Sequence, residues 1–483
     1  MNYYITTSIP YVNGEPHLGH ALEFMMADVL ARAARAKGAP VVFSIGTDEH
    51  GGKIAEKANE LGLEPKAFAD KMSENFRQLA RELHISNDRF IRTTDTGHEQ
   101  RAQLIWKALA KYIYKGSYEG WYCTGCEAFF TEAIVKENNG VCSNHNRPYE
   151  KVVEENYFFR LSEFSEQILH AIDSGDFRII PATRKHEILQ VIKDGLEDIS
   201  ISRPKDKISW GIPVPNDDNQ VMYVWFEALM NYITVLGYPE QEYFKKFWPA
   251  NVQVIGKDII RFHAAIWPGM LFALGLPLPK TLYVHGFINI DGQKMSKSLG
   301  NYVLPQEILA EYSADVFRYY FLRHMPSYED GDFSWDKLHE SYNHELANEL
   351  GNAVQRTIAM IHKYQNGLIG DIPPSSHDVE KYWQALEDCK FDRALDEVWL
   401  QVRGLNQYID ETKPWGIAKT GDKEHLQDVL AYQVSCLLEI AELLAPFMPE
   451  TAKKIQLIFA EGFLRPQEGT LFPRKDTAIH SNG

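Results

Sequence analysis

The sequence predicts an α/β protein in which a parallel sheet is interrupted by a turn-rich insertion and followed by an all-helical region. A β-branched and aromatic strand, a Pro/Gly-rich turn, a long helix and a second apolar strand follow one another within residues 3–45. Residues 116–220 are rich in turns and contain three of the five cysteines. From residue 336 onward, apolar residues recur almost only at helical spacing. Together these patterns indicate βαβ topology followed by a helical bundle.

The first βαβ unit is predicted in residues 3–45. Residues 3–7 form a strand, residues 10–16 a turn, and residues 18–37 a helix that ends at Gly38. A second strand, residues 40–45, leads into the segment GTDEHG. Because parallel sheets bind ligands at the carboxyl ends of their strands, PHLGH and GTDEHG are candidate binding segments.

The rest of the sheet is predicted from three apolar segments, VMYVWF, NVQVIG and TLYVHGF. The helical region has two apolar stripes, one containing Leu346 and Leu350 and another containing Val429 and Leu437. We therefore divide the chain into residues 1–115, 116–220, 221–280, 281–335 and 336–483.

Composition limits the classes of function. The 483-residue chain has a net charge of −16, which argues against non-specific binding to polyanions but not against one specific nucleic-acid partner. No apolar run is long enough to span a bilayer, and we see no secretion signal. Five cysteines, three of them clustered, do not suggest a disulfide framework. We therefore expect a cytoplasmic protein.

Two segments carry groups suited to phosphate chemistry. In PHLGH, His17 and His20 lie one turn apart at a helix start, and Gly19 lets a ligand approach the backbone. Free N–H groups at a helix start suit a nucleotide phosphate, although two surface histidines that cap a helix would give the same pattern. In DGQKMSKS, the Asp-Gly pair predicts a tight turn. Lys294 and Lys297 place ammonium groups on the loop that follows, although a solvated basic loop would give the same pattern.

Two pairs of soft metal ligands lie in the insertion. Cys123 and Cys126 form one pair, and Cys142 and His145 form the other. Four protein ligands suit a tetrahedral, structural Zn²⁺ ion and leave no position for a water molecule. We predict one zinc ion here; the alternative is reduced thiols and a surface histidine.

The order of HLGH and KMSKS resembles the signature of class I aminoacyl-tRNA synthetases. The segments SIPYVNGEPHLGH, GTDEHG, YVWFEALMNY, GKDIIRFH and HGFINIDGQKMSKS, with the helical tail, resemble the methionyl-tRNA synthetase family. The resemblance implies a Rossmann-type catalytic domain and ATP-dependent attachment of methionine to tRNA(Met) through a methionyl-adenylate, with release of AMP and pyrophosphate. Mg²⁺ is expected with ATP.

The resemblance also gives each segment a role. Residues 1–115 and 221–280 correspond to the two halves of the catalytic domain, and residues 116–220 to the connective insertion with its zinc knuckle. Residues 281–335 correspond to the KMSKS and stem-contact region, and residues 336–483 to the helical anticodon-binding domain. The implied partners are ATP, L-methionine and tRNA(Met), without a membrane. Since we see no appended oligonucleotide-binding domain, we expect a monomer.

Site residues follow from the same resemblance. The expected catalytic residues are His17, His20, Lys294 and Lys297. The expected ATP-binding residues are Gly19, Gly256, Asp258 and Lys297. The expected methionine-binding residues are Ile9, Tyr11, Asp48, Trp225, Ile259 and His263. In this set the Asp48 carboxylate pairs with the ammonium group and the apolar side chains enclose the thioether. The alternative for Trp225 and Ile259 is plain core packing.

Anticodon recognition is implied for one face of the helical tail. Asn352 and Arg356 lie four residues apart and can address unstacked bases, although a solvated helix face would have the same spacing. The aromatic residue that stacks on the anticodon is either Phe463 or Phe472, and we interpret Trp415 as structural.

Two alternative functions stay open. A class I synthetase for another apolar amino acid would share these motifs but would be far longer, with a large editing insertion. A catalytically silent tRNA-binding paralogue would usually lack a signature residue, whereas His17, Gly19, His20 and Lys297 are all present. Methionine-dependent exchange of pyrophosphate into ATP distinguishes these possibilities.

Overall fold

The computed structural model describes residues 2–125, 128–130, 132–143, 146–294, 301–374, 377–459, 462–464 and 469–476. The chain forms two compact units. The first, called the sheet unit, comprises Met1–Pro16, Ala34–Arg81 and Ile85–Val284. The second, called the helical unit, comprises His17–Ala33, Glu82–His84 and His285–Gly483. Among the described residues, no helix combines the length and apolar character needed to cross a bilayer.

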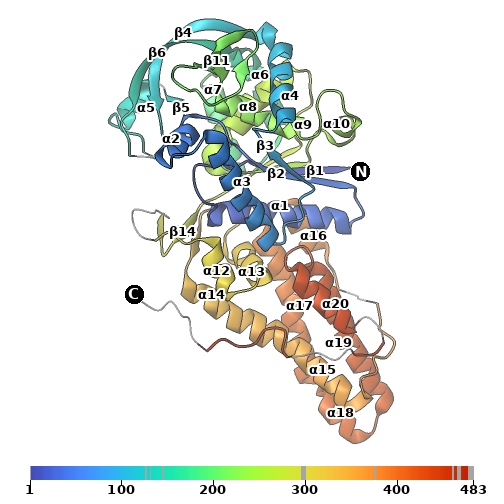
Figure 1. Cartoon of the computed structure of the whole chain (residues 1–483). Coiled ribbons are helices and arrows are strands. Elements are labelled where there is room, and N and C mark those ends of the chain that lie inside the picture. Colours follow the sequence, from blue (N-terminus) through green and yellow to red (C-terminus); the bar gives the residue numbers. More distant parts are fainter. Residues whose placement is uncertain are drawn as a thin grey trace. The chain divides into compact units, whose positions relative to one another are not determined.

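A six-stranded sheet in the order β3-β2-β1-β12-β13-β7 organises the sheet unit (Figure 1). Its strands are β1 (Tyr3–Thr7), β2 (Val41–Thr47), β3 (Arg89–Arg92), β7 (Arg178–Ile180), β12 (Val252–Gly256) and β13 (Thr281–His285). Strand β1 pairs in parallel with β2 and β12, β2 with β3, and β13 with β7. The strand order reverses between β1 and β12, where such sheets bind ligands. The predicted parallel α/β fold is confirmed.

One predicted strand of this sheet is wrong. The segment VMYVWF is divided between β11 (Asp217–Met222) and α8 (Val224–Leu229). Strand β11 pairs in antiparallel fashion with β9 (Ser202–Pro204) and β10 (Pro213–Val214) in a separate sheet. The error has a physical cause, since a short apolar run fits a buried strand and a buried helical turn equally well.

The turn-rich segment contains a second, antiparallel sheet in the order β5-β4-β6-β8. Its strands are β4 (Ile113–Cys123), β5 (Ala128–Phe130), β6 (Glu150–Phe159) and β8 (Ile199–Ser200), accompanied by α5 (Glu132–Glu137). The same segment supplies β7 to the main sheet. The boundaries 116 and 220 stay a prediction.

The remaining helices of the sheet unit are α2 (Gly52–Glu60), α3 (Pro65–Glu82), α4 (Thr96–Ala108), α6 (Ser165–Ser174), α7 (Ala182–Lys193), α9 (Asn231–Thr234), α10 (Glu242–Phe247) and α11 (Trp267–Ala273). Two short turns precede α11, a 3-10 helix at Lys257–Ile259 and a π-helix at Phe262–Ile266. Both segments come soon after the carboxyl end of β12, the 3-10 helix directly after it. Their side chains therefore lie near the binding edge of the sheet.

The helical unit begins with most of α1 (Leu18–Ala36) and continues after β13. A small sheet contains β14 (Ile288–Ile290), β15 (Gln293–Lys294) and β16 (Gly331–Phe333), with helices between β15 and β16. After β16, the described residues form helices and their connections, as predicted for the tail. The helices are α12 (Pro305–Glu311), α13 (Ala314–His324), α14 (Trp335–Ser341) with a π-helix at Tyr342–Gly351, α15 (Asn352–Gln365), α16 (Glu380–Glu387), α17 (Phe391–Thr412), α18 (Pro414–Thr420), α19 (Lys423–Leu444) and α20 (Pro449–Phe459).

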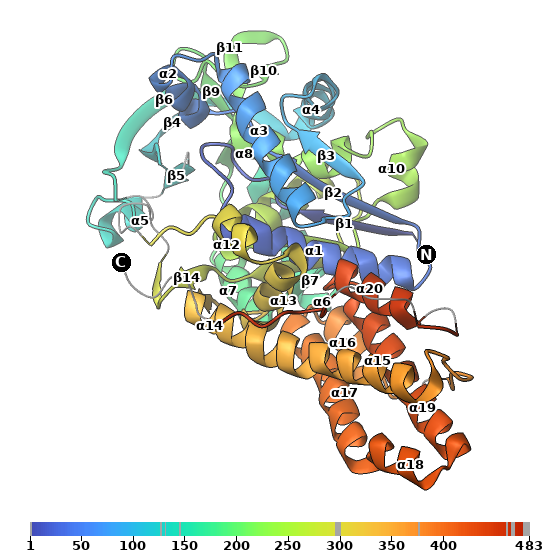
Figure 2. The same cartoon turned by 60° about the horizontal axis from the view of Figure 1, so that its bottom comes forward.

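Helices α15, α17 and α19 pack along one another, as Figure 2 shows. The predicted apolar stripes face this core: Leu346, Leu350, Leu437 and Ile440 are fully buried. Burial of these rows between helices is the main stabilising contribution in a bundle.

Candidate active site

Asp48 lies immediately after β2, at the binding edge of the sheet, and its backbone is held on both sides. Its N–H donates to the Pro10 carbonyl at 2.9 Å, and its carbonyl accepts from the Val12 N–H at 3.1 Å. These bonds form a parallel bridge between Asp48 and Tyr11. The structure therefore brings together the predicted ammonium ligand and one predicted wall of the methionine pocket.

The other predicted wall residues follow β11 and β12. The Trp225 and Phe262 rings stack with centroids 3.9 Å apart and planes 13° from parallel. Tyr11, Trp225, Ile259 and Phe262 all pack, partly buried, against the same hydrophobic core. None of these four residues is fully buried, whereas the predicted pocket residue His263 is only 2% exposed. Phe262 was missed by the sequence analysis, although it directly precedes His263.

Both ring nitrogens of His263 lie within hydrogen-bond distance of a partner. Its Nδ1 lies 3.0 Å from the Ile259 carbonyl, which can only accept, so Nδ1 carries the proton. Its Nε2 lies 2.6 Å from the Tyr232 hydroxyl and accepts from it. Ile9, also predicted, is half-buried. A Cβ atom at residue 46 would overlap Ile91 and crowd the Ile9 side chain. Glycine at this position therefore leaves room for Ile9.

A buried charge cluster lies directly after Asp48. The fully buried Glu227 carboxylate contacts His50 Nδ1 at 2.8 Å and His98 Nε2 at 2.9 Å, and His98 Nδ1 contacts the Thr234 hydroxyl at 2.8 Å. Burial alone favours a neutral His50 ring, but the Glu227 carboxylate outweighs it and raises the pKa of His50 to about 10. His50 is therefore a cation at neutral pH. No role was predicted for His50 or Glu227 from the sequence, although they lie within GTDEHG and YVWFEALMNY.

The predicted ATP-contacting residues of the sheet unit lie at the switch point. Gly256 ends β12, and Asp258 follows on the short 3-10 helix Lys257–Ile259 with an exposed side chain. Asp258 therefore lies just beyond the carboxyl end of β12, where parallel sheets bind ligands.

The signature histidines open α1 in the helical unit, and both rings are oriented by backbone N–H groups. The rings stack with centroids 3.6 Å apart. His20 Nδ1 accepts from the His17 N–H at 3.2 Å, and His17 Nδ1 accepts from the Gly19 N–H at 3.1 Å. A neutral ring whose Nδ1 accepts must carry its proton on Nε2. Both rings therefore present an Nε2–H donor.

His20 is held in the neutral form. Burial, the adjacent His17 ring and the His285 ring all lower the pKa of His20 well below its usual value. His285 Nε2 lies 2.9 Å from the Glu23 carboxylate, one turn along α1 from His20, and its Nδ1 donates to the Gly286 carbonyl at 2.8 Å. His285 lies within the segment TLYVHGF, but no role was predicted for it from the sequence.

The two predicted lysines are only partly described. Lys294 ends β15, where it pairs with Asn289, but its side chain lies outside the described residues. Lys297 also lies outside the described residues. The turn before them is confirmed, since Asp291 and Gly292 have φ angles of 50° and 75°, the pair of positive values that a tight hairpin requires.

Two of the four predicted zinc ligands can be placed. Cys123 and Cys142 are both buried in one small cluster with Val135 and Tyr149. The Cys142 N–H and carbonyl bond to Arg147 and Asn146, which folds the chain into a tight turn after Cys142. Cys126 and His145 lie outside the described residues, and the described residues alone contain no cluster of three metal ligands. Two buried thiols at a tight turn fit a zinc knuckle.

The predicted anticodon residues lie at the start of α15. Asn352 is exposed, and the Arg356 guanidinium bonds Asp410 at 2.6 Å and lies 5.8 Å from the Trp415 ring centroid. Trp415, which we interpreted as structural, is 39% exposed. Of the two candidate stacking residues, Phe472 is 8% exposed and Phe463 is 51% exposed. Phe472 is thus too buried to stack on a base.

Comparison with known proteins defines the class first. Residues 3–152 and 138–358 match the family described as tRNA synthetases class I (M). The switch-point sheet and the paired histidines at the start of α1 agree with that class.

The relatives then define the family. The chain is 44% identical to methionine–tRNA ligase of Caldanaerobacter subterraneus subsp. tengcongensis, over 94% of this chain and 73% of that protein. It is 40% identical to methionine–tRNA ligase of Thermotoga maritima, over 94% of this chain and 75% of that protein. The structure of Mycobacterium tuberculosis methionyl-tRNA synthetase in complex with methionyl-adenylate has a TM-score of 0.91 and 35% identity, covering 98% of this chain and 100% of that one. This chain belongs to the methionine–tRNA ligase family of class I tRNA synthetases.

Proposed function

We propose that this chain attaches methionine to tRNA(Met) in two steps. In the first, the methionine carboxylate attacks the α-phosphate of ATP, so that methionyl-adenylate forms and pyrophosphate leaves. In the second, a terminal ribose hydroxyl of tRNA attacks the acyl carbon and AMP leaves. The observation that carries the proposal is the match, at a TM-score of 0.91, to a synthetase that holds methionyl-adenylate.

Recognition of methionine is assigned to the sheet unit. The Asp48 carboxylate pairs with the ammonium group, and Tyr11, Trp225, Ile259 and His263, with Ile9 nearby, enclose the thioether chain. Aromatic walls suit a polarisable sulfur atom. No general base is needed in the first step, because the attacking carboxylate is already ionised.

Stabilisation of phosphate charge is assigned to the signature segments. The Nε2–H groups of His17 and His20 donate to phosphate oxygens, and Gly19 allows close approach to the helix start. Gly256 and Asp258 hold the ribose side of ATP. Lys297 binds the leaving pyrophosphate and Lys294 supports the loop. Mg²⁺ accompanies ATP and spreads its phosphate charge.

Methionine-dependent exchange of labelled pyrophosphate into ATP tests this function. We expect exchange with methionine and none of comparable rate with leucine, isoleucine or valine. The Asp48→Asn variant keeps the shape of the side chain but loses its charge, so its KM for methionine should rise by about 10²-fold. Exchange that depends on another amino acid, or no exchange at all, would contradict the proposal.

One structural zinc ion is proposed at Cys123, Cys126, Cys142 and His145. The burial of Cys123 and Cys142 in one small cluster supports the site. A segment that is held together by a metal ion needs few other buried side chains, and this cluster contains few. When bound, zinc would pin the turn-rich segment and take no part in the reaction. We expect about one zinc per purified chain and a loss of most of it in Cys142→Ala. Cys436→Ala, a buried thiol of α19, serves as the control and should retain the metal. A metal-free wild-type chain would contradict the site.

Anticodon recognition is proposed for Asn352, Arg356 and Trp415. The exposed indole ring beside the guanidinium supports this assignment, since both present flat surfaces for stacking on a base. We also propose the five-segment division of the chain, a monomeric state and a cytoplasmic location.

A further inference from the structure

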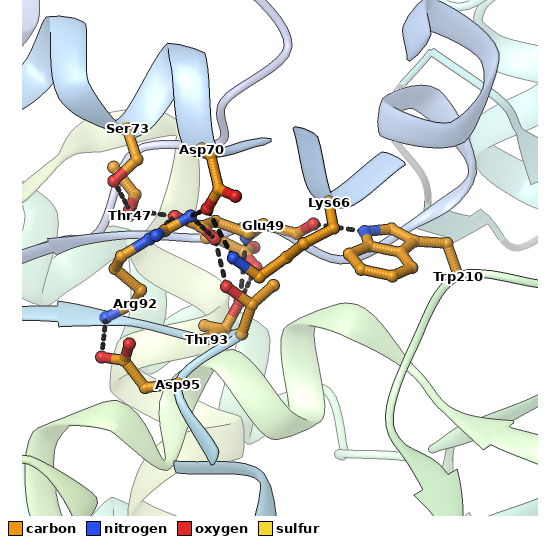
Figure 3. Close-up of polar contacts among 11 residues, drawn as sticks. Thr47, Glu49, Lys66, Asp70, Ser73, Arg92, Thr93, Asp95 and Trp210 are labelled. Carbon is orange, nitrogen blue, oxygen red and sulfur yellow. Dashed lines mark hydrogen bonds and ion pairs between the residues drawn. The ribbon is translucent and has the colours of Figure 1, made fainter. Parts of the chain in front are cut away.

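A second charge network is centred on Glu49, the residue after Asp48, within the sheet unit (Figure 3). The Glu49 carboxylate is fully buried and accepts two hydrogen bonds from Arg92, from Nε at 2.7 Å and from Nη2 at 2.8 Å. The hydroxyls of Thr47 and Thr94 donate to the same carboxylate. Four donors hold this carboxylate in one position. Loss of any of them would leave part of a buried charge without a hydrogen bond.

The network also fixes the backbone next to Asp48. The Glu49 N–H donates to the Thr93 hydroxyl at 2.9 Å, and the Glu49 carbonyl accepts from the Trp210 indole N–H at 2.6 Å. The Thr93 hydroxyl in turn lies 3.5 Å from Asp48 Oδ1 and can donate to it. Since Asp48 and Glu49 are adjacent, a shift of the Glu49 backbone moves the Asp48 carboxylate.

We propose that Arg92, acting through Glu49 and Thr93, is a positioning residue that sets the Asp48 carboxylate for the methionine ammonium group. The proposal rests on the proposed role of Asp48. Arg92 ends β3 and touches no proposed ligand-binding group itself. Its outer contact, with Asp70 at 2.5 Å, is made to a side chain that is 48% exposed and also pairs with Lys66. The buried Glu49–Arg92 ion pair, not the exposed Arg92–Asp70 ion pair, orients Asp48.

A positioning role predicts a selective loss. Thr93→Val removes the hydroxyl but keeps the shape and the Glu49–Arg92 ion pair, so the variant should fold. Its KM for methionine in pyrophosphate exchange should rise by about tenfold, whereas its KM for ATP should stay unchanged. The double variant Glu49→Gln with Arg92→Gln avoids an unpaired buried charge and should show a rise of at least the same size.

Two controls separate positioning from loss of fold. The first is 4-(methylsulfanyl)butanoate, which is methionine without its ammonium group. Its inhibition constant should be the same for wild type, Thr93→Val and the double variant, because this compound has no ammonium group for the Asp48 carboxylate to bind. The second is Lys66→Ala, which removes only the exposed end of the network and should leave both KM values unchanged.

The outcomes are distinguishable. If Asp48→Asn leaves the KM for methionine unchanged, the proposed role of Asp48 fails. If Asp48→Asn raises it but the double variant Glu49→Gln with Arg92→Gln does not, the positioning role of Arg92 fails and the proposed function stands; no rise in Thr93→Val would remove Thr93 from the pathway. Equal rises in the KM for methionine, the KM for ATP and the inhibition constant of the butanoate would show a merely structural network and would overturn the inference.

Discussion

His20→Ala should slow methionine-dependent pyrophosphate exchange by about 10²–10³-fold with little change in the KM for methionine. The ring is neutral and its Nδ1 is already bonded to the His17 N–H, so its Nε2–H is a donor that is oriented before the nucleotide binds. Such a donor acts on charge that develops at the phosphate in the transition state. Its removal therefore lowers kcat rather than substrate affinity.

The conservative variant and a remote histidine sharpen this test. His20→Asn keeps an N–H donor and should recover part of the rate. His186→Ala removes an exposed imidazole from α7 and should leave the rate unchanged. An exchange rate within about threefold of wild type in His20→Ala would contradict phosphate stabilisation by this ring, since one lost donor there costs several kcal/mol.

Patterns in the sequence predicted those elements of the fold that depend on residues close together in the chain. The strand at residues 3–7, the helix starting at residue 18 and the turn at Asp291 follow from side-chain chemistry within a few residues, and all are confirmed. The segment VMYVWF was assigned wrongly because its pairing partners, not its own residues, decide whether it joins the main sheet.

The same limit explains which site residues were missed. Arg92 and Glu49 are 43 residues apart and His285 and Glu23 are 262 apart, so neither pair is visible as a motif. Buried ion pairs form only where the fold excludes water from both partners, and that exclusion is a tertiary property. Phe262 was missed for another reason: a phenylalanine next to a motif histidine is indistinguishable from core until its stack on Trp225 is seen.

Arg318→Met should lower the free energy of unfolding by about 3–5 kcal/mol. Arg318 on α13 is fully buried and contacts the buried Asp28 carboxylate at 2.8 Å. It also donates to three backbone carbonyls, those of Phe447 and Pro446 at 2.7 Å and of Leu83 at 3.1 Å. Methionine fills a similar volume but donates no hydrogen bond, so three carbonyls and part of a carboxylate lose their partners.

Denaturant unfolding of a graded series measures the effect. Arg318→Lys keeps the charge, but one ammonium group cannot reproduce the planar geometry of the guanidinium, so an intermediate loss is expected. Arg393→Ala removes a side chain that is 71% exposed and should change stability by less than about 0.5 kcal/mol. In Arg318→Met, Asp28 keeps only Arg32 as its charged partner, at 2.7 Å, so adding Asp28→Asn removes a buried, partly satisfied charge and should recover part of the loss. Asp28 lies on α1, the helix that begins at the signature histidines, so Arg318 links that helix to the junction between α19 and α20. A loss of less than 1 kcal/mol in Arg318→Met would mean that water replaces the guanidinium at all four acceptors, and Arg318 would then not hold α1 in the helical unit.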